Sequence, residues 1–132
     1  MADPVLRLAS DPATLLGAPP EWTRELLADS ELALLPGAGG LDDIDRLAHA
    51  LGMVSVTLLR GETSPPAQDE TVMAWAGAMP LAWIAAGFSD KVRGWAHSRG
   101  PMTLLVEAGG PLSDDEQRRV ARFAAVLGRQ SE

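Results

Sequence analysis

Four short apolar runs, spaced regularly along the chain, most constrain what this sequence can fold into. The runs are Leu32–Leu35, Val54–Leu59, Leu81–Ala86 and Met102–Val106, and they begin about 20–27 residues apart. A segment with the spacing of a helix follows each run. This alternation of strand and helix predicts a parallel sheet with right-handed crossovers. We expect the last three runs to be adjacent parallel strands, each followed by a helix. Because the runs are almost entirely apolar, we expect strands that are covered on both faces.

The segments after these runs are predicted to be helices. Apolar residues after the first run recur at the spacing of one helix face: Leu41, Ile44, Leu47, Ala48 and Leu51. Further helices are expected over Gln68–Met79 and Asp90–Ser98. The last helix begins at Ser113, which has the spacing of a capping box with Glu116. Its buried stripe is expected to consist of Val120, Phe123, Ala124 and Leu127.

The first 30 residues are predicted to be a helical segment that packs on the core. Asp11-Pro12 pairs an N-cap residue with a proline at the first helical position, which predicts a short helix over Ala13–Leu16. A second helix is expected over Glu21–Ala28. We therefore expect residues 1–30 to cover a single α/β domain formed by residues 31–132. That domain is a small three-layer structure, with a short, mainly parallel sheet of three to four strands flanked by helices.

The first run leaves a second fold open. Leu32–Leu35 could instead continue the helix before it, and the core would then be an α+β domain with three strands, some of them antiparallel. Gly40–Leu59, a helix that leads into a strand, resembles the start of a GAF-type sensor domain. Pro111–Glu116 resembles the entry into the final helix of such domains. This resemblance implies a GAF-like ligand sensor as the alternative fold and function.

Composition limits the classes of partner. The chain has 132 residues, 46% of them hydrophobic, with a net charge of −7 and no cysteine. One domain of this length needs no disulfide to fold. An acidic chain is a poor binder of nucleic acid or of anionic membranes, because both attract basic surfaces. The sequence has no apolar run long enough for a transmembrane helix and no basic, then apolar, N-terminus. We expect a cytoplasmic protein that binds neither membrane nor nucleic acid.

One set of candidate site residues lies where predicted strands end. In a parallel sheet, the loops that follow the strands meet at one edge. Those loops place a hydroxyl and three carboxyl groups on one rim: Glu62, Ser64, Asp90 and Glu107. The plain alternative is that Asp90 begins a helix and Glu62 is a solvated loop residue. If the rim is functional, the chain is a small enzyme or ligand-binding domain.

A second set of candidates suggests association. Four tryptophans are many for a chain with two phenylalanines and no tyrosine. Trp83 lies in an apolar run and is assigned to the core, whereas Trp75 and Trp95 lie on predicted helices, with Met73 and Met79 near the first. Indoles and methionines on one helical face are common at interfaces, although core packing would also explain them. We expect these four residues to form the interface of a homo-oligomer, most simply a dimer, or to bind a protein partner.

Other sequence patterns that could indicate phosphate binding, metal binding or catalysis are weak. Pro36–Gly40 is rich in glycine but matches no phosphate-binding motif, so it is interpreted as a flexible turn. Asp45 and His49 share a helix face, but two groups do not complete a metal site. No nucleophile motif is present, and we expect no cofactor and no metal. The leading hypothesis is a small non-enzymatic binding or regulatory module that acts through protein association.

Overall fold

The computed structural model describes residues 5–28, 30–35, 40–53, 57–59, 61–62 and 64–131. Its five strands are β1 (Leu6–Ser10), β2 (Ser30–Leu34), β3 (Thr57–Leu58), β4 (Leu81–Ala85) and β5 (Thr103–Glu107). Its α-helices are α1 (Pro12–Leu16), α2 (Pro20–Leu27), α3 (Gly40–Leu51), α4 (Pro65–Ala76), α5 (Asp90–Arg99) and α6 (Asp114–Ser131). A single 3₁₀ turn, Gly100–Met102, joins α5 to β5.

The strands form one sheet in the order β3-β2-β1-β4-β5, and every neighbouring pair is parallel. The chain starts in the middle with β1, adds β2 and β3 on one side, and then crosses over to add β4 and β5 on the other. This is the doubly wound arrangement that alternating strands and helices predict. The α/β class and the parallel sheet are therefore confirmed.

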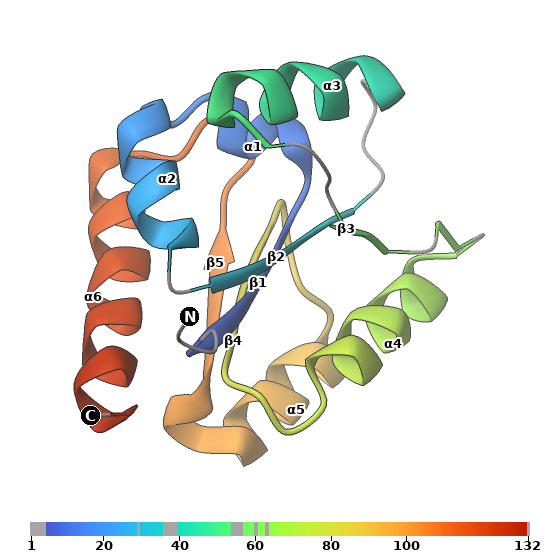
Figure 1. The fold of residues 1–132 in the computed structure, drawn as a ribbon. Helices are drawn as coiled ribbons and strands as arrows, with labels where there is room; N and C mark the ends of the chain where they lie inside the picture. Colours follow the sequence, from blue (N-terminus) through green and yellow to red (C-terminus); the bar gives the residue numbers. More distant parts are fainter. Residues whose placement is uncertain are drawn as a thin grey trace.

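Helices cover both faces of this sheet, as Figure 1 shows. One face packs against α1, α2, α3 and α6, and its buried side chains include Leu8, Leu34 and Ile84. The other face packs against α4 and α5, and its buried side chains include Ala9, Ala33 and Trp83. Successive apolar residues of β1, β2, β4 and β5 thus enter different cores. This explains why these strands carry apolar residues on both faces rather than alternating apolar and polar residues.

The largest difference from the sequence-based expectation is β1. The first 30 residues were expected to be helical, and three to four strands were expected in the sheet. Instead Leu6–Ser10 is the central strand, paired with both β2 and β4, and the sheet has five strands. Arg7 interrupts the apolar run of this segment, but its Nε donates to Glu31 Oε2 at 3.1 Å and its Nη1 donates to the carbonyl oxygen of Trp75. A cation in a central strand is tolerated because these acceptors form hydrogen bonds with it.

The other strands agree in part with the prediction. Leu32–Leu34 belong to a strand and not to the preceding helix, since β2 covers Ser30–Leu34, and Leu35 directly follows it. Of the predicted strand Val54–Leu59, residues 54–56 lie outside the described part, and β3 covers Thr57–Leu58. We expected this strand to lie beside the two later ones. That was wrong, because β3 pairs with β2 at the far edge, whereas β4 and β5 do pair with each other in parallel. This parallel pairing does not support the GAF-like alternative.

The last helix follows its prediction closely at its start. The Glu116 backbone N–H donates to Ser113 Oγ at 3.2 Å, and the Ser113 backbone N–H donates to Glu116 Oε1 at 2.8 Å. These reciprocal bonds are a capping box. Val120 and Leu127 are buried, as expected, but Phe123 is only half-buried at the edge of the core. Within the described residues, no helix has the length and apolar character needed to cross a bilayer.

Candidate functional site

The winding of the chain opens a crevice where β1 and β4 end. The segment after β1 leads into α1, on the face that also carries α3 and α6, whereas the segment after β4 leads into α5 on the opposite face. Neighbouring strands whose following segments diverge leave a gap at the carboxyl edge of the sheet, and ligands of open α/β sheets bind at such a switch point. The structure has a cavity of about 450 Å³ there.

Residues at the carboxyl ends of four of the five strands line the cavity. Asp11 follows β1, Leu35 follows β2, Ala85 ends β4 with Ala86 after it, and Ala108–Pro111 follow β5. Backbone hydrogen bonds hold two of these positions: the Leu35 N–H donates to Ser10 O at 2.9 Å, and the Ala108 N–H donates to Ala85 O at 2.8 Å. The walls are therefore extensions of the sheet, which holds them in place.

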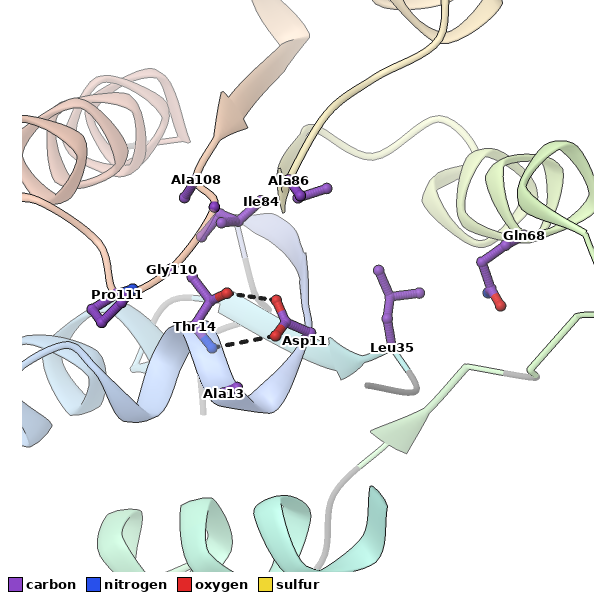
Figure 2. A pocket seen from close by; sticks show the side chains of 12 residues that line it. Asp11, Ala13, Thr14, Leu35, Gln68, Ile84, Ala86, Ala108, Gly110 and Pro111 are labelled. Carbon is purple, nitrogen blue, oxygen red and sulfur yellow. Dashed lines mark hydrogen bonds between the residues drawn. The ribbon is translucent and has the colours of Figure 1, made fainter. Parts of the chain in front are cut away.

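The floor beside β1 is polar and its geometry is fixed. Asp11 is the N-cap of α1, and its carboxylate accepts from two groups of Thr14: Oγ1 at 2.6 Å and the backbone N–H at 3.3 Å. Figure 2 shows both bonds, with Leu35 and Gln68 beyond Asp11 on the side of α4. Thr14 is 5% exposed, so this bidentate contact is shielded on one side. The carboxylate is thereby held in one orientation.

Next to α1, the lining is a loop of small residues that is fixed by close packing. Ala108, Gly109, Gly110 and Pro111 line the cavity between β5 and α6. Pro111 lies so close to Gly17 at the end of α1 that a Cβ on Gly17 would lie 2.4 Å from Pro111 Cβ. Real side chains do not approach so closely, hence α1 and this loop touch through a site that only glycine fits. The N-terminal helix and the β5–α6 loop thus form one connected wall.

The remaining lining is mainly apolar. Leu35, Ile84 and Ala86 contribute hydrocarbon, and Gln68 on α4 adds a side-chain amide. The Gln68 Oε1 accepts from the backbone N–H of Glu62 at 3.0 Å, which ties α4 to the segment after β3. Among the described residues that line the cavity, Asp11 is the one with a charged side chain.

The four predicted rim residues do not converge on this cavity. Ser64 is the N-cap of α4, where its Oγ accepts from the Ala67 N–H at 3.3 Å. Glu62 Oε1 accepts from Thr71 Oγ1 at 3.0 Å. Asp90 is exposed in the first turn of α5, and Glu107 forms an ion pair with Arg93 of the same helix. The structure brings these side chains to α4 and α5, and none is among the described residues lining the cavity.

The sequence-based interpretation missed the cavity residues because it missed β1. Asp11 was expected to be a helix cap, which it is, but it also directly follows the central strand. The signal was the short apolar segment Val5–Ala9 just before Asp11-Pro12. A strand at that segment would have added Asp11 to the rim at the carboxyl edge.

The predicted interface residues lie on the α4 and α5 side. Met73, Trp75 and Trp95 are half-buried and pack against the core between these helices and the sheet. Arginines cover both indoles, with the Arg7 guanidinium carbon 5.3 Å from the Trp75 ring centre and that of Arg99 4.6 Å from Trp95.

The fourth interface residue lies apart from the helix that was expected to carry it. Because α4 ends at Ala76, Met79 lies in the turn that follows. Its carbonyl oxygen accepts from Arg99 Nη2, and burial lowers the pKa of the Arg99 guanidinium from its ordinary value. Self-association through these four residues stays a prediction.

Comparisons with protein-family models, with curated proteins and with solved structures give no match to this chain. In the described part of the chain, no group of three or more His, Asp or Glu side chains is placed to hold a metal ion. Any functional conclusion therefore rests on the cavity itself.

Proposed function

We propose that this chain is a small-molecule-binding domain whose ligand occupies the cavity between the carboxyl ends of β1 and β4. The observation that carries the proposal is the coincidence of a cavity with the switch point of the sheet. Ligand cavities in proteins have volumes of roughly 300–1,000 Å³, and this one, at about 450 Å³, lies within that range. A ligand here would touch segments from both halves of the sheet.

The lining suits a compact, mostly apolar ligand. Small residues, Ala86, Ala108, Gly109 and Gly110, leave the space open, and Leu35 gives it an apolar surface. Polar groups are few, as is usual in cavities that bind small organic molecules. Binding is proposed rather than catalysis, because the hydroxyl that donates to the Asp11 carboxylate, Thr14 Oγ1, belongs to a side chain that is almost fully buried.

The proposal keeps one part of the expectation from the sequence. A ligand-binding domain that uses the carboxyl edge was the alternative to protein association, and the cavity lies at that edge. The residues differ: Asp11, Thr14 and the β5–α6 loop take the place of Glu62, Ser64, Asp90 and Glu107.

The test uses a cavity-filling variant. Benzyl alcohol serves as a neutral, compact probe, and binding is followed through the backbone amide NMR signals of Gly109 and Gly110. Ala86→Phe places a ring at an exposed lining position and is expected to weaken binding at least tenfold. Ala74→Phe makes the same change on an exposed residue of α4 that does not line the cavity, and should bind as the wild type does.

Two results would overturn the proposal. One is a wild-type chain in which benzyl alcohol, up to several tens of millimolar, leaves both glycine signals unmoved. The other is equal weakening by Ala86→Phe and Ala74→Phe, because the effect would then not come from filling the cavity.

A further inference from the structure

The Asp11 carboxylate can receive further hydrogen bonds within the cavity. A carboxylate has about four lone-pair positions, and Thr14 fills two of them through its hydroxyl and its backbone N–H. Glu62 and Glu107 are engaged by Thr71 and Arg93. Asp11, in contrast, lines a cavity, and in the described part of the chain its carboxylate is paired with the neutral groups of Thr14. Its negative charge is therefore available to a ligand.

We infer that the cavity selects small organic cations, with a protonated amino group held by Asp11 and an apolar body held by Leu35 and Ala86. This inference rests on the proposed function, since it names the ligand chemistry of the same cavity. An ammonium group offers three donors and no acceptor, which matches an acceptor-only carboxylate. Hydrogen bonds to a charged partner are about twice as strong as those between neutral groups.

An anionic ligand is disfavoured by the same geometry. A carboxylate or phosphate near Asp11 would meet a like charge across a partly apolar space, where the repulsion is stronger than in water. The net charge of −7 adds a weaker, long-range repulsion of anions and attraction of cations. Both effects favour a cationic ligand over an anionic one.

Thr14 is a positioning residue in this scheme. Its 2.6 Å hydroxyl contact and 3.3 Å backbone contact hold the carboxylate in one orientation, so a ligand loses less freedom when it binds. Without the hydroxyl the carboxylate keeps its charge but can rotate. Selectivity for cations should then decrease without being lost.

The test compares three probes that share a phenyl ring: benzylamine, a cation at pH 7, neutral benzyl alcohol, and the anion benzoate. Their dissociation constants are measured on the full chain by NMR titration of the Gly109 and Gly110 amides. In the wild type, benzylamine is expected to bind about tenfold more tightly than benzyl alcohol, which corresponds to about 1.4 kcal/mol, and benzoate more weakly than either. Raised salt should reduce this preference by screening.

The variants separate charge from folding. Asp11→Asn keeps a good N-cap residue and should bring the ratio of the benzylamine and benzyl alcohol constants to near one. Thr14→Val, of similar shape, should give an intermediate ratio, and Thr14→Ser, which restores the hydroxyl, should recover most of the preference.

The outcomes distinguish the two proposals. If all probes bind in the cavity but benzylamine has no preference over benzyl alcohol, or if Asp11→Asn keeps that preference, the cation inference is wrong and the proposed function stands. If none of the three probes shifts the glycine amides, both are wrong.

Discussion

Replacing Gly17 by alanine should destabilise the protein, whereas the same change at Gly94 should stabilise it. Gly17 has φ −77° and ψ −13°, which alanine adopts readily. The obstacle is space, because the new Cβ would lie 2.4 Å from Pro111 Cβ and 2.8 Å from Pro111 Cα. Gly94 lies inside α5 and is exposed, and a Cβ added there would have nothing within 4 Å.

The magnitudes follow from these two environments. Overpacking costs roughly 1–3 kcal/mol, and removing a glycine from the unfolded chain returns about 0.4–1 kcal/mol. Gly17→Ala should therefore lower the free energy of unfolding by about 1–2 kcal/mol. Gly94→Ala meets no steric obstacle and should raise it by about 0.5–1 kcal/mol.

Urea denaturation of the two variants and the wild type measures these differences directly. In the same experiment, the affinity for benzyl alcohol should fall in Gly17→Ala, because relief of the contact moves Pro111, which lines the cavity. A Gly17→Ala protein as stable as the wild type would refute the close approach of α1 to the β5–α6 loop. Stabilisation by Gly94→Ala would still be expected in that case, so the two results are independent.

Three further predictions concern α6 and an exposed ion pair. Ser113→Ala should cost about 1 kcal/mol in urea denaturation, and Glu116→Ala should cost less in that background than alone, because the two caps act together. Phe123→Ala should cost about 2 kcal/mol, below the roughly 3–5 kcal/mol of a fully buried ring; an unchanged melting temperature would show that α6 does not pack on this core. The Glu70 pKa is lowered by its 2.5 Å hydrogen bond from Lys91 and by the charge of that lysine. The ion pair with Lys91 therefore stabilises the fold above pH 4.5, and this contribution decreases as the pH falls through the lowered pKa. Glu70→Gln should be slightly less stable than the wild type at neutral pH and equally stable in acid. A stability deficit that persists in acid would contradict the pairing.

The alternation of strands and helices could be predicted from the sequence because its causes are local. Leu81–Ala86 is apolar throughout, and β4 covers all but its last residue. The capping box at Ser113 needs only residues three apart. Such patterns depend on neighbouring residues, and they were sufficient to predict the α/β class and the parallel sheet.

The boundaries of α4 show where local patterns stop being sufficient. The apolar spacing suggested Gln68–Met79, but the helix begins at Pro65, after the Ser64 cap, and ends at Ala76 before Gly77 at φ 55°. A proline pair is compatible with a first turn, since its missing N–H groups would be unpaired there anyway. The positive φ of Gly77 then turns the chain toward β4.

The position of β1, and with it the cavity, was decided by tertiary structure. Arg7 makes this segment look unlike a central strand, and what makes it acceptable is Glu31, 24 residues later, and the end of α4, 68 residues later. No local pattern shows such partners. The sequence by itself determined which segments become strands and helices in most of the chain. Only the packed structure determined that β1 lies beside β4, because the order of the strands depends on which faces of the sheet the helices can cover together. That order places Asp11 in the crevice between them.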